Sequence, residues 1–268
     1  MATYVISDVH GCYTAFQELL RKAGFDEEND ELIIAGDIID RGKENIEMLR
    51  YLENAPDYVT FLMGNHDYDF MGYCEKFCNA FDNGRFDGDF TEMKKDDWLL
   101  NSFVSDKYGT VSQLLINYDV TIEDFRKWYN LFKDLDYYRI KEINDKKYII
   151  VHAGYITDKG YSRFCMKGLS PSYLRWGIEY FYMWARSDGY FEGGMNNATV
   201  IFGHTPTILD EMFYNDGKVW IKRNKEKNCR FIDIDCGYVY KDKFANANMA
   251  IIRLEDEKIT YLEDKKGR

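Results

Sequence analysis

The chain has 268 residues, with 46 acidic and 35 basic side chains and a net charge of −11. Because it contains only three prolines and no Pro-, Gly- or Ser-rich linker, we expect one domain over residues 1–268 rather than two small ones. The acidic balance argues against general binding to nucleic-acid polymers or anionic membranes, so a phosphorylated substrate requires local positive charge.

Six cysteines are scattered along the chain without paired CxxC spacing, and neither an N-terminal signal nor a long apolar span is present. These features predict a cytoplasmic protein with reduced thiols. Cys74 and Cys78 share a predicted helix face, but no second pair completes a zinc site. We therefore expect two half-buried thiols at these positions.

The chain begins with a predicted β-α-β unit. Residues 3–7 form a β-rich run, which Asp8-Val9-His10-Gly11 follows directly. Apolar residues recur at helical spacing over residues 13–23, and residues 31–35 return to a strand. A right-handed crossover makes the two strands parallel. The polar residues after both strands are then expected at the same edge of the sheet.

The second strand leads into Ala35-Gly36-Asp37-Ile38-Ile39-Asp40-Arg41-Gly42, which brings two carboxylates and a guanidinium close together. Open α/β sheets bind ligands at the carboxyl ends of their strands, so Asp37 is placed to face metal ions there. Taken alone, the same stretch also fits a capped turn with an exposed arginine. The motifs elsewhere in the chain decide between these interpretations.

A third unit and a long insertion follow. A helix is expected over residues 43–54 and a strand over residues 58–63, which runs into Gly64-Asn65-His66-Asp67. Residues 68–136 are rich in aromatic and charged side chains and predict a mostly helical insertion that covers the carboxyl edge of the sheet, with a loop over residues 81–90. A role for the insertion as a lid or a protein-docking surface is a hypothesis.

Histidines occur in one recurrent setting. Residues 147–151 predict a strand that leads into His152, and residues 199–202 predict a strand that leads into His204. The chain contains four histidines, and each lies within two residues of a glycine just after a predicted strand: His10, His66, His152 and His204. A structural role explains one such histidine but not four. Carboxylates combined with imidazoles, without thiolates, favour an octahedral Mn or Fe site over structural zinc.

The remaining segments complete the predicted fold. Residues 171–184 predict an aromatic helix that ends near Arg186. Short antiparallel strands of a second sheet, packed against the first, are expected at residues 218–223, 229–235, 249–255 and 258–263. The sequence therefore predicts an α/β fold, a two-sheet β-sandwich core flanked by helices, with a helical, aromatic-rich insertion.

Five motifs in order resemble the signature of the calcineurin-like metallophosphoesterases: Asp8-x-His10-Gly11, Gly36-Asp37-x-x-Asp40-Arg41-Gly42, Gly64-Asn65-His66-Asp67, His152 and Gly203-His204. Trp184-x-Arg186 and Phe202-Gly203-His204-Thr205-Pro206 extend the resemblance to bacteriophage lambda-type and bacterial serine/threonine protein phosphatases. The resemblance covers nearly the whole chain apart from the insertion. Ser7 and Asp67 depart from it, since the family usually has glycine and glutamate there.

The resemblance implies a metallophosphoesterase fold that holds two divalent metal ions, with Mn preferred and Fe, Zn or Ni as alternatives. The implied ligands of one metal are Asp8, His10 and Asp37, and those of the other are Asp37, Asn65, His152 and His204. Asp37 then bridges the two ions. The implied chemistry is direct in-line attack on phosphorus by a hydroxide that bridges the metals.

The resemblance also implies roles for residues that do not bind metal. His66 protonates the leaving oxygen, and Asp40 orients His66. Arg41 and Arg186 hold the phosphate oxygens, which supplies the local positive charge that the acidic chain needs. A turn role for Asp40 and a surface ion pair for Arg186 are the alternatives.

The expected function is hydrolysis of phosphate monoesters, with phosphoserine or phosphothreonine in proteins as substrate and additional activity on small phosphoesters. The alternative is hydrolysis of diadenosine tetraphosphate or another nucleotide at the same site. A third interpretation, a silent phosphate-binding module, is disfavoured because every expected ligand is present. The oligomeric state is not predicted.

Overall fold

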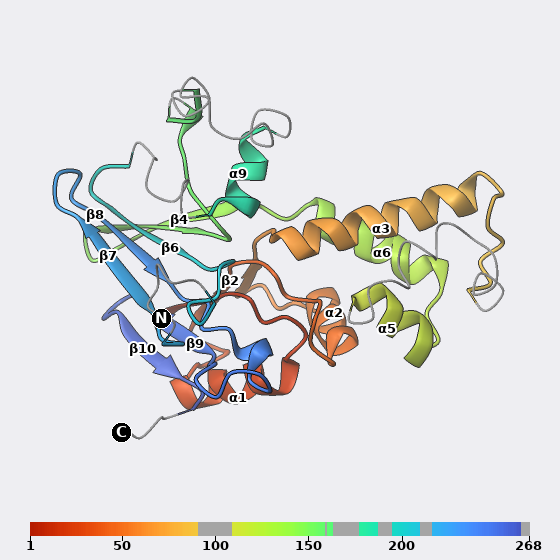
Figure 1. Cartoon of the computed structure of the whole chain (residues 1–268), viewed down its shortest axis with the longest axis horizontal. Coiled ribbons are helices and arrows are strands. Elements are labelled where there is room, and N and C mark those ends of the chain that lie inside the picture. Colours follow the sequence, from red (N-terminus) through yellow and green to blue (C-terminus); the bar gives the residue numbers. More distant parts are fainter. Residues whose placement is uncertain (91–108, 159, 163–176, 187–194, 210–215, 264–268) are drawn as a thin grey trace.

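The computed structural model describes residues 1–90, 109–158, 160–162, 177–186, 195–209 and 216–263 (Figure 1). The first sheet contains β1 (Thr3–Ile6), β2 (Glu31–Ile34), β3 (Val59–Phe61), β9 (Ala250–Arg253) and β10 (Lys258–Tyr261). The second sheet contains β4 (Tyr138–Ile143), β5 (Lys146–Val151), β6 (Ala198–Phe202), β7 (Trp220–Asn224) and β8 (Cys229–Asp233). Their strand orders are β10-β9-β1-β2-β3 and β4-β5-β6-β8-β7.

Within each sheet, the strands that precede the histidine motifs run parallel to one another. In the first sheet β1 pairs with β2 in parallel, with Val5 opposite Ile33, and β2 pairs with β3 in parallel. In the second sheet β5 pairs with β6 in parallel, with Ile149 opposite Val200, and β6 pairs with β8 in parallel. The carboxyl ends within each sheet therefore lie side by side, as ligand sites of α/β folds require.

Alternate side chains of the central strands face opposite sides of each sheet, and both sides are buried. Val5 of β1 belongs to the apolar layer between the two sheets, together with Ile150 and Ile201 of the second sheet. Tyr4 and Ile6, its neighbours in the chain, face the layer that α1 covers. Burial on both faces explains why these strands contain runs of consecutive apolar residues instead of a strict alternation with polar ones.

Helices cover the outer faces of the sheets. In the described part of the chain they are α1 (Tyr13–Ala23), α2 (Asn45–Glu53), α3 (Asn65–Asp82), α5 (Thr110–Asn117), α6 (Ile122–Lys133) and α9 (Ile178–Trp184). Helix α1 buries Phe16, Leu19 and Leu20 on one face and ends at Gly24, which adopts the left-handed conformation common after helices. None of the described helices combines the length and apolar character that crossing a bilayer requires.

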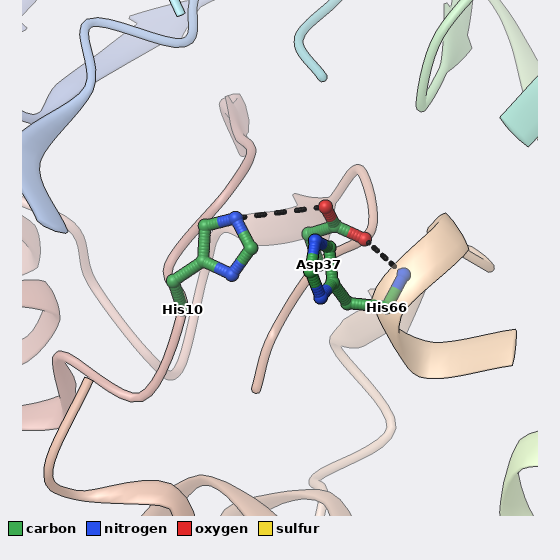
Figure 2. Close-up of side chains that lie close together, drawn as sticks. All are labelled: His10, Asp37 and His66. Atoms are coloured by element: carbon green, nitrogen blue, oxygen red, sulfur yellow. Dashed lines mark hydrogen bonds and ion pairs between the residues drawn. The ribbon is translucent and has the colours of Figure 1, made fainter. Parts of the chain in front are cut away.

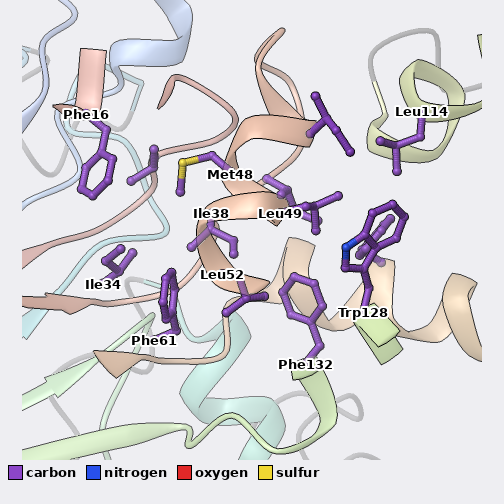
Figure 3. Packing of buried hydrophobic residues seen from close by; sticks show 14 of the residues in the cluster. Phe16, Ile34, Ile38, Met48, Leu49, Leu52, Phe61, Leu114, Trp128 and Phe132 are labelled. Carbon is purple, nitrogen blue, oxygen red and sulfur yellow. The ribbon is translucent and has the colours of Figure 1, made fainter. Parts of the chain in front are cut away.

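The insertion packs as a helical extension of the first sheet. In Figure 1, α3 and α6 run alongside one another and extend away from the sheets. Aromatic rings hold them together: the Phe77 and Phe125 centroids lie 4.8 Å apart, and those of Phe70 and Trp128 lie 6.0 Å apart. Figure 3 shows that this cluster continues through Leu52 of α2 to Phe61 of β3. Most of the aromatic side chains described here are therefore core residues.

The structure confirms the two-sheet α/β fold and changes several details. Residues 138–143 form β4, which we did not expect. β9 pairs antiparallel to β1, and β10 pairs antiparallel to β9, so both belong to the first sheet rather than to the second. Helix α3 begins at Asn65 and continues to Asp82, so it includes the motif and the start of the expected loop. Only the part of the expected 171–184 helix from Gly177 onward lies within the described residues.

Candidate active site

The polar residues that follow the strands share an unusual backbone conformation. Positive φ values occur at Asp8 (52°), His10 (47°), Asp37 (53°), Asp40 (73°), Arg41 (69°) and His204 (72°). Residues other than glycine adopt this left-handed region at an energetic cost, and such strain is concentrated at functional sites. The tight turns aim side chains from several strands at a common point, which explains why they persist.

Asp37 lies where the motifs of both sheets meet. Its Oδ2 atom lies 3.6 Å from Nε2 of His10, which follows β1, and 3.4 Å from Nε2 of His152, which follows β5. Its Oδ1 atom accepts a hydrogen bond of 2.9 Å from the backbone N–H of His66, at the start of α3. Figure 2 shows the His10 and His66 contacts of this carboxylate. Asp37 is buried, which raises its pKa, but the neighbouring histidines, His152 above all, outweigh burial and lower it.

Around His152, three hydrogen-bond acceptors converge. Its Nδ1 atom lies 3.0 Å from the carbonyl oxygen of Ala35, which can only accept, so Nδ1 carries a proton. In the neutral imidazole Nε2 is then an acceptor, yet it faces Oδ1 of Asn65 at 3.0 Å and Oδ2 of Asp37 at 3.4 Å. A cation between these atoms relieves their repulsion. The donor set therefore fits a metal ion.

Two further buried atoms lack the partners that burial demands. Among the described residues, Oδ1 of Asp8 and Nε2 of His204 are buried without a hydrogen-bond partner. The two residues are adjacent, because the backbone N–H of His204 donates to Oδ2 of Asp8 at 3.0 Å. Burial, and secondly Asp37, raises the pKa of Asp8 to about 8, while burial and His152 lower that of His204. Both groups thus lack a compensating charge, which a metal ion supplies.

Arg41 lies between His10 and His66. Its Nη1 atom donates to Nε2 of His10 and its Nη2 atom donates to Nε2 of His66, each over 2.7 Å. His10 keeps its own proton on Nδ1, 2.8 Å from the carbonyl oxygen of Ile39. Burial and the Arg41 charge lower the pKa of His10 to about 3, so this imidazole is neutral and offers Nε2 as a ligand.

His66 and Asp40 form a hydrogen-bonded pair beside this group. Nδ1 of His66 lies 2.8 Å from Oδ2 of Asp40. Burial lowers the pKa of His66, but Asp37 and the hydrogen bond to Asp40 outweigh it, so that the net shift is upward. The same bond lowers the pKa of Asp40 against the effect of its burial. The upward shift of the pKa favours the protonated imidazole, the form that a general acid needs. Because Nε2 of His66 accepts from Arg41 in this arrangement, it can carry that proton only after Arg41 has turned away from it.

The two arginines lie on different sides of the group. The guanidinium of Arg41 lies 5.6 Å from the ring centroid of Tyr240, a cation–π contact that sequence reasoning did not anticipate. Arg186 is exposed, and its Nη1 atom donates to Oγ1 of Thr205 over 2.9 Å, next to His204. Thr205 therefore positions Arg186 beside the second histidine group.

Asp67 has a structural role that we did not predict. Its Oδ2 atom accepts hydrogen bonds from the backbone N–H groups of Asp37 (2.7 Å) and Gly64 (3.0 Å), and its Oδ1 atom accepts one from Ile38 (3.0 Å). The carboxylate thus joins the turn after β2 to the first turn of α3. An acidic residue three positions after a helix N-cap is a known capping signal, so the sequence contained a clue.

Glycines allow these turns to approach one another. Gly36 has a φ of +84°, and a Cβ atom there would lie 2.7 Å from Cα of Gly64 and 2.8 Å from Nδ1 of His152. A Cβ atom on Gly64 would collide with the backbone nitrogen and the carboxylate of Asp37. Gly36 therefore leaves room for the turn at Gly64 and for His152, and Gly64 leaves room for Asp37.

Two groups of described residues have the geometry to hold metal ions, and they share Asp37. One consists of His10, Asp37 and His66, and the other of Asp37, His152 and His204. In the first group His66 takes a place that we had expected for Asp8, whose Oδ1 lies 3.9 Å from Nε2 of His10. The fold and this site define an α/β protein with paired imidazole–carboxylate groups at the edge where two sheets meet.

Residues 1–211 match the calcineurin-like phosphoesterases, and the chain belongs to this family. Among curated relatives, symmetrical bis(5′-nucleosyl)-tetraphosphatases from Buchnera aphidicola subsp. Acyrthosiphon pisum (strain Tuc7) and Proteus mirabilis (strain HI4320) are 48% identical over 67 residues and 40% identical over 76 residues. These matches cover 25% and 28% of this chain, and 24% and 28% of the relatives. The chain thus aligns with about a quarter of each relative's length.

Solved structures share the fold over nearly the whole chain. A putative diadenosine tetraphosphatase is 16% identical, with a TM-score of 0.52 over 99% of this chain and 95% of that one. A protein serine/threonine phosphatase from Saccharomyces cerevisiae is 15% identical, with a TM-score of 0.52 over 100% of this chain and 81% of that one. At these identities the similarity concerns the fold and leaves the substrate open.

Proposed function

We propose that this chain is a metal-dependent hydrolase of dinucleoside polyphosphates of the diadenosine tetraphosphate class. The observation that carries the proposal of metal-dependent phosphoryl transfer is the position of Asp37, a buried carboxylate within 3.6 Å of His10 and 3.4 Å of His152. The names of the curated relatives, symmetrical bis(5′-nucleosyl)-tetraphosphatases, support the substrate class over a phosphoprotein. This choice reverses the order in which the sequence motifs ranked the two substrates.

In the proposed site, Asp8, His10 and Asp37 hold one metal ion. The second is held by Asp37, Asn65, His152 and His204. When bound, divalent ions supply Lewis-acid charge to the phosphate oxygens and lower the pKa of water, so that water attacks phosphorus at neutral pH. We propose Mn as the metal, since oxygen and imidazole ligands without thiolate suit it.

The residues that do not bind metal hold the substrate and protonate its leaving oxygen. Arg41 and Arg186 donate hydrogen bonds to phosphate oxygens, for which a planar guanidinium is suited. Water loses a proton to the solvent and forms the new bond to phosphorus while the bond to the bridging oxygen breaks. His66 donates its proton to that oxygen, and Asp40, 2.8 Å from Nδ1 of His66, orients the imidazole.

The test compares substrates on one preparation of the full chain. Hydrolysis of diadenosine tetraphosphate, a phosphoserine peptide and an aryl phosphate is measured after chelation and again after Mn²⁺ is restored. We expect Mn-dependent turnover of all three, with kcat/KM highest for the dinucleotide. If Mn²⁺ stimulates turnover of none of the substrates, the proposed chemistry is wrong. If kcat/KM is higher for the peptide than for the dinucleotide, only the proposed substrate class is wrong.

The phosphoserine or phosphothreonine substrate is the second candidate. It is supported by the Trp184-x-Arg186 and Phe202-Gly203-His204-Thr205-Pro206 motifs, which resemble those of bacterial protein phosphatases. The same metal site and the same general acid serve either substrate, because the chemistry at phosphorus is shared. Substrate preference therefore depends on groups outside the metal site.

A further inference from the structure

A pocket of about 490 Å³ lies between the start of α3 and α9. Tyr68 and Asp69 line it from α3, and Glu179, Tyr180, Met183 and Trp184 line it from α9. Figure 1 shows α9 above the N-terminal end of α3, and the rings of Tyr68 and Trp184 are in contact, with centroids 5.7 Å apart. The volume falls in the range of pockets that bind small molecules.

The pocket lies next to the proposed general acid. Asp69 follows His66 by three residues in α3, which places both on one helix face about 4.5 Å apart along the axis, at 1.5 Å per residue. On the other wall, Trp184 precedes Arg186 by two residues. Because an acid lies on the side of the departing oxygen, a group in this pocket belongs to the leaving part of the substrate.

Aromatic surface dominates the pocket. The rings of Tyr180 and Trp184 are stacked, with centroids 4.6 Å apart and planes at 10°, and the Tyr68 ring meets Trp184 edge-on at 85°. These contacts hold the rings in place before a ligand arrives, which reduces the entropy that binding costs. Flat, preorganised aromatic surface suits a nucleobase, since every base has a π face that stacks on such rings.

Two carboxylates join the tyrosine hydroxyls as polar groups of the pocket. Asp69 and Glu179 are both exposed and can accept hydrogen bonds from ribose hydroxyls or an exocyclic amino group. Their negative charge repels phosphate, while the guanidinium groups of Arg41 and Arg186 attract it. A nucleoside diphosphate leaving group is thereby oriented, with its phosphates toward the arginines and its nucleoside in the pocket.

We infer that the pocket between α3 and α9 binds the nucleoside on the leaving side of the scissile phosphate. This inference rests on the proposed function and explains how a site with shared phosphate chemistry selects a dinucleotide. A cationic peptide side chain is the competing occupant, because carboxylates and aromatic rings also attract an arginine. The absence of phosphate from both adenosine and N-acetylarginine amide makes them suitable probes of the pocket alone.

Binding of these two probes to the metal-free full chain is measured by isothermal titration calorimetry. We expect saturable adenosine binding that Trp184→Ala weakens at least tenfold, that Trp184→Phe retains within about threefold, and that Asp69→Asn also weakens. Tyr118→Ala, an exposed aromatic outside the pocket, is the matched control and should bind adenosine normally. Thermal melting of each variant verifies that it is folded.

Kinetics separate failure of this inference from failure of the proposed function. We expect Trp184→Ala to raise the KM for diadenosine tetraphosphate at least tenfold more than that for an aryl phosphate. If the dinucleotide is hydrolysed but Trp184→Ala changes neither this ratio nor adenosine binding, the pocket assignment is wrong and the function stands. If the dinucleotide is not hydrolysed but adenosine binds as described, the pocket stands. Tighter binding of N-acetylarginine amide than of adenosine overturns the nucleoside pocket.

Discussion

Oδ2 of Asp40 lies 2.8 Å from Nδ1 of His66, and this carboxylate is itself held by the insertion. Its Oδ1 atom accepts hydrogen bonds from the backbone N–H (2.7 Å) and the hydroxyl (2.8 Å) of Thr110, the first residue of α5. The Thr110 hydroxyl also accepts a hydrogen bond from the backbone N–H of Asp40 at 3.0 Å. The insertion thus positions the residue that orients the proposed acid.

Replacement of the proposed acid tests its role directly. We expect His66→Asn to lower kcat by roughly 10²–10⁴, the range that general acid catalysis supplies. Metal content, measured by mass spectrometry after desalting, should stay at the wild-type value if His66 acts outside the metal site. An unchanged kcat contradicts the assignment, and loss of metal instead places His66 among the ligands.

Thr110 should matter only through Asp40. Thr110→Val removes the hydroxyl but keeps the backbone hydrogen bond, so we expect kcat to fall roughly threefold to tenfold, about the value of one hydrogen bond. Thr110→Ser keeps the hydroxyl and should restore most of the rate. Steady-state kinetics on an aryl phosphate provide the measurement. Equal loss in both variants argues for a packing effect of the methyl group instead.

Asp37 is the carboxylate that both candidate metal groups share. We therefore expect Asp37→Ala to lower the metal content of Mn-loaded, desalted protein by at least half, because each ion loses a charged ligand. His66→Asn, which changes another residue of the group formed by His10, Asp37 and His66, is the control for metal content. Chelation should also lower the Tm of the wild type more than that of Asp37→Ala, since bound ligand stabilises the folded state. Equal metal content in the variant and the wild type contradicts the shared role.

Two glycines of one segment should respond in opposite directions to alanine. Gly64→Ala places a Cβ atom against the backbone and carboxylate of Asp37, so we expect a loss of about 1–3 kcal/mol in the free energy of unfolding, as for overpacking. Gly72→Ala, within α3, meets no atom within 4 Å and should gain about 0.5–1 kcal/mol. Urea unfolding measures both. A stable, active Gly64→Ala protein contradicts the close approach.

Part of the stability that the protein loses in acid should come from Glu257. Its carboxylate accepts hydrogen bonds from Arg230 at 2.7 and 2.8 Å, and this arginine above all, with Lys146 and Tyr148, lowers its pKa from 4.5 to about 2. A lowered pKa means that the ionised form stabilises the folded state above pH 4.5 and loses this effect as the pH falls toward 2.

Glu257→Gln imitates the protonated side chain. We expect the wild type to be the more stable protein at pH 7, and the difference to shrink between pH 4.5 and 2. Urea unfolding of both proteins across this range provides the curve. A difference that does not change with pH means that Glu257 stabilises the fold by packing, not by its charge.

The elements that determine the site could be predicted from short stretches of the chain. Strands ending at Ile6, Ile34 and Val151 were expected within one residue of their observed ends, because apolar runs buried on both faces are unambiguous over a few residues. The residues that follow them lie together because parallel strands bring their carboxyl ends to one edge. The assigned roles of these residues remain predictions.

Local sequence patterns did not predict the contacts between segments far apart in the chain. β4 alternates exposed and half-buried residues and lacks an apolar run, and its short apolar–polar alternation over residues 138–141 was too weak for us to predict a strand. The sequences of β9 and β10 fit a strand of either sheet, and only the pairing of β9 with β1, and of β10 with β9, assigns them to the first. Thr110 contacts Asp40 across 70 positions, and no periodicity encodes that distance.

By itself, the sequence determined which chemical groups this protein brings to its sheet edge: imidazoles and carboxylates placed directly after buried strands, with Arg41 in the turn after β2. Side-chain type and strand-end position are local properties, so a linear pattern records them. The tertiary structure decided which of these groups touch, that Asp67 joins two turns, and that α3 and α9 enclose a pocket beside His66. Those relationships depend on the packing of segments far apart in the chain, where burial and hydrogen bonding select one arrangement.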